Sequence, residues 1–121
     1  SMNWHHPCAY NPDFKETFHR TARARLRTLA TLMGWNKDSF DLRNNRAGIA
    51  VSGEITLHYD AVYIQVSQPA TGHDSGILIR RCNGLKDYTG ERNHFASLSL
   101  LDDLPALAGR VNAVLGSEVH P

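Results

Sequence analysis

Residues 47–66 read AGIAVSGEITLHYDAVYIQV, and this stretch decides the fold class. Apolar and polar side chains alternate over 47–58 and again over 62–67, which is the period-two pattern of half-buried β-strands. The short connection at Tyr59 and Asp60 predicts that the two runs form an antiparallel hairpin. The buried face is expected to carry Ile49, Val51, Gly53, Ile55, Leu57, Val62, Ile64 and Val66. The outward face is expected to carry Ser52, Glu54, Thr56, His58, Tyr63, Gln65 and Arg80.

A helix over 12–33 precedes this hairpin. Asn11 is a suitable N-cap, Pro12 suits the first helical position, and Gly34 is a natural C-cap. At 100° per residue, an apolar face collects Phe14, Phe18, Ala22, Leu26, Leu29, Leu32 and Met33. Arg25 projects from within that apolar sector, so it must reach the edge of the face or meet a buried acid.

The remaining elements are shorter. A strand is expected over 40–42, followed by a turn at 44–46, and another strand over 77–82. A polar loop over 83–95 then leads to a helix over 102–115.

The order α-β-β-β-β-α predicts an α+β fold. We expect a single domain over 1–121, in which an antiparallel sheet of three to five strands within 40–82 is flanked by the N-terminal and C-terminal helices. Both helices are expected on one face of the sheet. Residues 1–11 are expected to form an irregular arm.

The charge is close to balanced over the whole chain but not within it. The formal charge of +1 excludes an overwhelmingly basic nucleic-acid binder. Residues 15–46 nevertheless hold eight basic and three acidic residues, a surplus of +5. The expected electropositive surface consists of Arg20, Arg23, Arg27, Arg43 and Arg46. Such a surface suits successive phosphates, and the alternative is an ordinary solvated helix face.

The outward face of the sheet is a second candidate surface. Tyr63, Gln65 and Thr56 combine a stacking ring with hydrogen-bonding groups, as in sheets that bind single-stranded nucleic acid. Ordinary exposed strand residues, or a contact in a homodimer, explain the same pattern.

The loop 83–95 is the candidate for an enzyme. His94 is the candidate general base and Arg92 the candidate anion-binding group, with Asp87 and Glu91 as nearby carboxylates. The sequence contains no nucleophile elbow, P-loop or HExxH motif that would name a reaction. The alternative is a loop held by its own ion pairs.

Two cysteines, Cys8 and Cys82, are too few for a disulfide framework, and we expect free thiols in a reducing cytoplasm. No apolar run is long enough for a membrane span, so no membrane partner is expected. The histidines and cysteines lack the local spacing of a metal site, and neither a metal nor a cofactor is expected.

The segments GIAVSGEITLHYDAVYIQVSQ and DYTGERNHFASLSLLDDLPAL resemble small uncharacterised proteins carried by plasmids and integrative mobile elements of proteobacteria. That resemblance implies a role in mobile-element biology. In topology alone, the expected order of elements is similar to the double-stranded-RNA-binding domain. The Lys-rich start of that family's last helix is replaced here by Asp102, Asp103, Leu104 and Pro105.

The sequence therefore favours a cytoplasmic binding module that contacts nucleic acid or a protein partner through its arginine-rich helix face. Two alternatives stay open: a small enzyme with an acid–base site in the loop 83–95, and a homo-oligomeric interaction protein.

Overall fold

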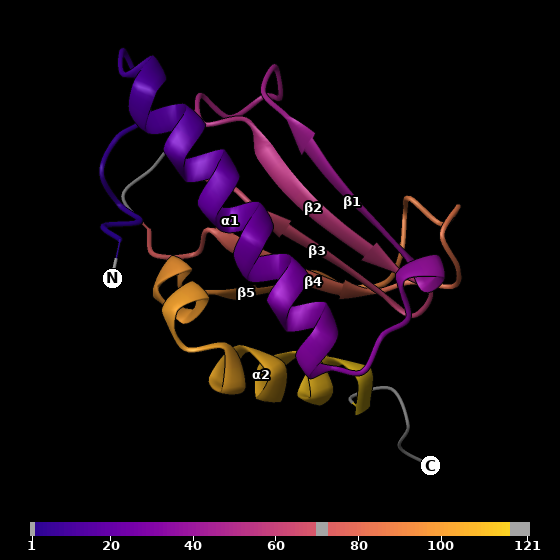
Figure 1. The fold of residues 1–121 in the computed structure, drawn as a ribbon. Coiled ribbons are helices and arrows are strands. Elements are labelled where there is room, and N and C mark those ends of the chain that lie inside the picture. The colour runs from indigo at the N-terminus through magenta and orange to yellow at the C-terminus, as the bar shows by residue number, and fades with distance from the viewer. Residues whose placement is uncertain (1, 70–72, 117–121) are drawn as a thin grey trace.

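A five-stranded antiparallel sheet, covered on one face by two helices, forms the protein (Figure 1). The computed structural model describes residues 2–69 and 73–116. The strands follow one another in the sheet in chain order: β1 (Phe40–Asn45), β2 (Glu54–Tyr59), β3 (Val62–Val66), β4 (Ile77–Arg81) and β5 (His94–Ala96). The helices are α1 (Pro12–Leu32), the 3-10 turns η1 (Lys37–Ser39) and η2 (Leu98–Asp102), and α2 (Leu104–Gly116).

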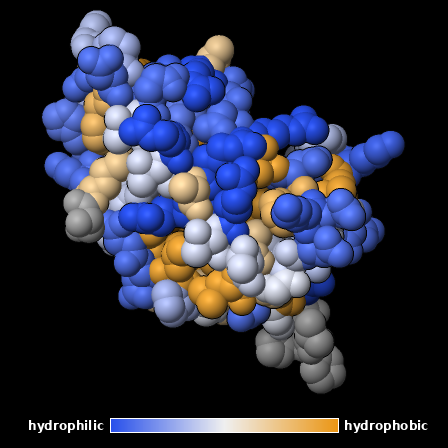
Figure 2. All heavy atoms as spheres, viewed as in Figure 1, coloured by the Kyte–Doolittle hydropathy of each residue, from blue (hydrophilic) through white to orange (hydrophobic). Residues whose placement is uncertain are grey.

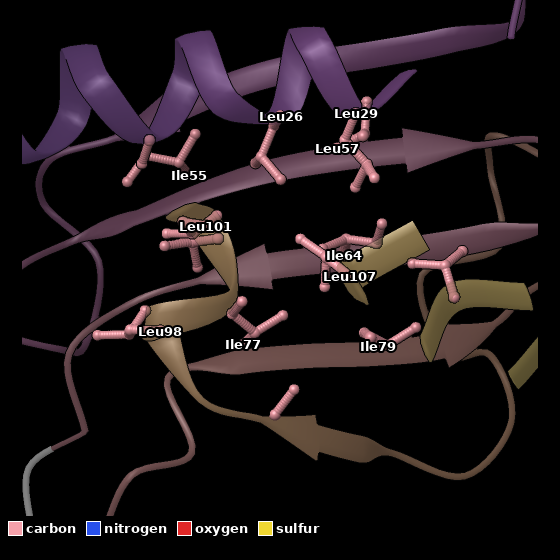
Figure 3. Packing of buried hydrophobic residues seen from close by; sticks show 14 of the residues in the cluster. Leu26, Leu29, Ile55, Leu57, Ile64, Ile77, Ile79, Leu98, Leu101 and Leu107 are labelled. Carbon is pink, nitrogen blue, oxygen red and sulfur yellow. The ribbon is translucent and has the colours of Figure 1, made fainter. Parts of the chain in front are cut away.

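The core lies between the helices and one face of the sheet. α1 contacts β1 and β2, α2 contacts β4, and the two helices contact each other. Figure 3 shows Leu26 and Leu29 of α1 above Ile55 and Leu57 of β2. Because alternate strand residues share a face, this burial leaves the opposite face of the sheet free of helices. The predicted α+β architecture is confirmed.

The N-terminal helix begins as predicted. The side-chain oxygen of Asn11 accepts the backbone N–H of Phe14 at 3.1 Å, and Pro12 follows the cap. Leu32 was expected on the apolar face, but it is the last residue of the helix and is exposed. Arg25 reaches the edge of the face, where its Nη2 lies 3.5 Å from a carboxylate oxygen of Asp102.

The central hairpin is confirmed, with Leu57 of β2 opposite Ile64 of β3. The segment before it differs from the prediction. β1 continues to Asn45, where the sequence predicts a turn, and Asn45 pairs with Glu54. Residues 47–53 must then reverse the chain, so they form the connection and not the start of a strand. The prediction that Ile49 and Val51 are buried is therefore wrong, and both are exposed.

Two residues predicted to face outward are buried. The side-chain oxygen of Ser52 accepts the backbone N–H of Gln68 at 2.9 Å inside the β1–β2 connection. His58 does lie on the helix-free face, but Tyr88 of the following loop packs against its ring. The alternation of residues along a strand does not show which side chains a loop far away in the sequence will bury.

The fifth strand begins at the end of the predicted polar loop 83–95 and extends past it to Ala96. β5 pairs with β4, with Leu78 opposite Phe95 and Ile79 opposite His94. Its three residues are too few to show a period-two pattern in the sequence. Because β5 begins at His94, the loop between β4 and β5 consists of residues 82–93.

The N-terminal arm is irregular, as predicted, but part of it belongs to the core. Trp4 and Cys8 are buried, and the Trp4 ring packs edge-on against Phe18 with centroids 5.8 Å apart. The side chain of Gln68 holds the arm: it accepts the N–H of Cys8 at 3.0 Å and donates to the carbonyls of Trp4 and His6 at 3.1 and 2.6 Å.

Both cysteines are free, as predicted, and both are buried. Over residues 2–69 and 73–116, neither helix combines the length and the hydropathy that crossing a membrane would need.

A buried histidine connects α1 to the start of the sheet. His19 is fully buried; its Nε2–H donates to the carbonyl of Ser52 at 2.7 Å, and its Nδ1 accepts from the side chain of Asn44 at 3.0 Å. These partners require the neutral ring with the proton on Nε2. Burial lowers the pKa of His19 below its usual value.

We expect this histidine to make the free energy of unfolding depend on pH. An unfolded histidine binds a proton at about pH 6.5, whereas folded His19 binds one only at lower pH. The stabilisation is therefore complete above about pH 7.5 and is lost as the pH falls through about 6.5 toward the folded pKa. Urea unfolding at a series of pH values measures this slope. The variant His19→Gln is expected to remove it, and an unchanged slope in that variant would contradict the assignment.

Candidate binding site on the open face of the sheet

Polar side chains on the helix-free face, here called the open face, follow the register of the strands. One row across the sheet contains Asp41, His58, Tyr63 and Arg80, each opposite the next on neighbouring strands. A second row contains Arg43, Thr56, Gln65, Leu78 and Phe95. Because every second residue of a strand shares a face, both rows point the same way.

The open face is hollowed where β1, β2 and β3 meet the loop. The recess has a volume of about 290 Å³, near the lower end of the range for small-ligand pockets. It is lined by Asp41, Arg43, Asn44, Asn45, Glu54, Thr56, His58, Tyr63 and Tyr88.

Three rings form one side of this recess. His58 packs edge-on against Tyr63 and Tyr88, with ring centroids 5.3 and 5.5 Å apart. The Arg80 guanidinium lies 4.4 Å from the centroid of the Tyr63 ring, a cation–π contact. Tyr88 is 63% exposed, so its ring is the accessible aromatic surface of the group.

The loop that carries Tyr88 is held by its own hydrogen bonds. The carboxylate of Asp87 accepts the backbone N–H groups of Asn83, Thr89 and Gly90 at 2.9, 3.2 and 2.9 Å. These bonds hold the pKa of Asp87 below its usual value. The Nη2 of Arg80 donates to the Tyr88 carbonyl at 2.9 Å, which fixes the loop to the sheet. The ring of Tyr88 is therefore positioned before any ligand arrives.

The recess carries charges of both signs. Arg43 is exposed and lies 3.5 Å from Asp41, and Glu54 accepts from the side chain of Asn45 at 3.4 Å. The Tyr63 hydroxyl donates to Gln65 at 2.9 Å. Burial, with a further contribution from Glu54, raises the pKa of Tyr63, so this hydroxyl stays protonated. The recess thus offers donors, acceptors and an aromatic surface without a strong net field.

The predicted catalytic candidates lie in different surroundings. Asp87 is bound by loop amides, and Glu91 lies 3.4 Å from Nε of Arg81. Arg92 is exposed. His94 lies opposite Ile79, and it lines a second hollow with Arg110 and Val114 of α2, on the helix-covered face.

The predicted arginine surface is also divided. Arg20 and Arg27 are exposed on α1. Between them, Arg23 donates to the Leu42 carbonyl at 3.0 Å and to the Asn44 side chain at 2.7 Å. Arg46 forms a two-pronged ion pair with Glu16 through Nε, 2.6 Å from Oε1, and Nη2, 3.1 Å from Oε2. Arg43 lies on the open face instead, the face that also carries Tyr63 and Gln65.

No family model matches this sequence, and no curated protein or solved structure matches it either. The geometry of the open face therefore carries the functional argument by itself. Within residues 2–69 and 73–116, no three His, Cys, Asp or Glu side chains are arranged to hold a metal ion.

Sequence reasoning missed Tyr88 and Asp41 as members of the site. Tyr88 reaches the sheet through loop folding, and no spacing rule relates it to Tyr63. The sequence did contain a signal for Asp41. It lies in the predicted strand 40–42 and two residues before Arg43, so both side chains are expected on the same face.

Proposed function

We propose that this protein is a binding module whose open face takes one unpaired base of a single-stranded nucleic acid into the recess. The observation that supports this best is the placement of Tyr88 beside His58 and Tyr63, because unpaired bases are bound chiefly by stacking on aromatic rings. The proposal continues the prediction made for Tyr63 and Gln65 and moves the site away from the helix arginines.

The recess also has the groups that read a base edge. Glu54 and Asp41 accept hydrogen bonds from amino or ring N–H groups, and Thr56 and Asn45 both donate and accept. Arg43, exposed at the rim, is placed to contact a phosphate. A base inserted between these groups would have both its ring face and its edge contacted.

The charge pattern predicts how this binding depends on salt. Two carboxylates in the lining offset Arg43, so few phosphates are neutralised on binding. For single strands, log affinity falls with log salt by about 0.7 per neutralised phosphate. We expect the slope of log affinity against log salt to correspond to one or two phosphate contacts, with base stacking providing most of the affinity.

The test is fluorescence anisotropy of labelled single-stranded DNA and RNA against matched duplexes. We expect single strands to bind more tightly than duplexes. Tyr88→Ala should weaken binding about 5- to 150-fold, because stacking contributes about 1–3 kcal/mol per base. Tyr88→Phe keeps the ring and should retain most of the affinity.

Two controls distinguish the recess from other surfaces. Tyr10→Ala removes an exposed tyrosine of the N-terminal arm and should leave affinity unchanged. The double variant Arg20→Ala with Arg27→Ala removes the exposed helix cations and should also have little effect. Equal binding by wild type and Tyr88→Ala, or a loss confined to the double arginine variant, would refute the recess as the site.

A further inference from the structure

A further hollow, distinct from the recess and from the hollow beside His94, lies between α1 and the free edge of β1. We call it the edge groove; it has a volume of about 470 Å³ and is lined by Arg27, Thr31, Trp35, Lys37, Phe40 and Leu42. Figure 2, drawn from the same side as Figure 1, shows hydrophobic atoms between hydrophilic ones in the region between α1 and β1. The groove therefore combines an apolar floor with a polar rim.

The floor of the edge groove is held in place by packing and strand pairing. The Trp35 ring stacks on Tyr59 with centroids 4.1 Å apart and planes only 7° apart. Phe40 lies opposite Tyr59 in the sheet, and both Phe40 and Leu42 pack partly against the core. An apolar side chain entering the groove would meet a surface that is already formed.

The backbone beside the groove has hydrogen-bonding groups that face away from the sheet. β1 is an edge strand, and the carbonyl of Ser39 accepts the N–H of Asp60 at 3.3 Å. In an antiparallel pair, the backbone N–H and C=O groups of successive residues point alternately toward and away from the partner strand. The carbonyl of Ser39 points toward the partner strand, so the N–H and C=O groups of Phe40 and Leu42 point away from it. Arg23 binds the outward carbonyl of Leu42. The remaining outward groups can pair with a short added strand.

The rim of the edge groove is cationic. Arg27 and Lys37 are both exposed, and neither forms an ion pair with any acid of residues 2–69 and 73–116. Among the described residues, none that lines the groove is acidic. The complementary occupant is apolar at its centre and acidic at its ends.

We propose that the edge groove binds an extended segment of a partner protein, with apolar side chains in the groove and acidic residues at the rim. The segment adds to β1 as a short antiparallel or parallel strand, hydrogen-bonded to Phe40 and Leu42. A second copy of this chain fits less well, because pairing at this edge would bring the rim cations of both copies together. The proposal does not depend on nucleic-acid binding at the recess.

The test uses two short fluorescein-labelled peptides with the same valine-rich centre, one flanked by glutamates and the other by lysines. We expect the glutamate-flanked peptide to bind more tightly. The double charge reversal Arg27→Glu with Lys37→Glu should weaken that peptide at least about tenfold and favour the lysine-flanked one. Arg20→Glu, which reverses an exposed charge elsewhere on α1, is the matched control and should leave both affinities unchanged.

Amide hydrogen exchange measured by NMR checks the strand pairing. Binding of the glutamate-flanked peptide should slow exchange at Leu42 and Phe40 and leave the outward-facing tip of the 47–53 connection unchanged. Equal affinity for the two peptides, absence of protection at β1, or displacement of the peptide by single-stranded DNA would overturn the proposal. The proposal would also be overturned if the wild-type protein sediments as a dimer whose interface buries β1 and excludes the peptide.

Discussion

Replacing Trp4 with alanine is expected to lower the free energy of unfolding by about 3–5 kcal/mol. The ring is 2% exposed and packs edge-on against Phe18. Its removal leaves a cavity at the N-terminal end of α1 and frees the arm that Gln68 holds. Because small domains are stable by only about 5–15 kcal/mol, this loss is a large part of the total. Urea unfolding followed by circular dichroism measures it.

Trp4→Phe is the matched control for this prediction. The indole Nε1–H of Trp4 is buried and has no hydrogen-bond partner in the described part of the chain. Phenylalanine keeps most of the apolar surface and removes that unpaired donor, so its effect should be much smaller. A loss below about 1 kcal/mol in Trp4→Ala would show that the arm unfolds independently of the core.

Replacing Gly53 with alanine is expected to be comparably destabilising. Gly53 has φ +66°, a backbone conformation that costs a non-glycine residue about 1–2 kcal/mol. A Cβ there would overlap the carbonyl oxygen of Asn45 and lie 2.9 Å from Cα of Arg46. Relief of this clash requires backbone movement, which adds about 1–3 kcal/mol. Thermal and urea unfolding both report the change.

Gly109→Ala is the control for Gly53→Ala, and it is expected to change the free energy of unfolding in the opposite direction. Gly109 lies within α2, and a Cβ built there meets no atom within 4 Å. Alanine should therefore raise the free energy of unfolding by about 0.5–1 kcal/mol. The Gly53 prediction would be wrong if both alanine variants changed stability in the same direction. Gly53 directly precedes Glu54, which pairs with Asn45 and lines the recess, so Gly53→Ala should also weaken ligand binding there.

Local chemistry was enough to predict several elements of this fold. Asn11 and Pro12 mark the start of α1, because capping needs only neighbouring atoms. The β2–β3 hairpin follows from alternation and a short connection. Ile49 and Val51 continue the alternating pattern of β2, so they were predicted to be buried in a strand. They are exposed instead, because β1 is longer than expected and these residues form the connection between β1 and β2.

The candidate sites were less predictable than the fold. Tyr63 and Gln65 were assigned to the outward face of the sheet from alternation, and they do lie on the open face, whereas Arg43 was predicted to lie with the helix arginines and lies on the open face instead. Arg23, predicted as part of a free cationic stripe, instead binds the edge of β1. Helical periodicity places a residue on a face of its own helix, but it does not show which neighbour covers that face.

The sequence by itself determined the order of the two α-helices and the first four strands, the N-cap of α1 and the alternation of the hairpin, because each depends on residues close together in the chain. The tertiary structure alone decided that Tyr88 meets His58, that Gln68 holds Trp4, and that an apolar groove with a cationic rim borders β1. These contacts join residues far apart in the sequence. They depend on how the loop and the arm close over the sheet, and no local propensity specifies that closure.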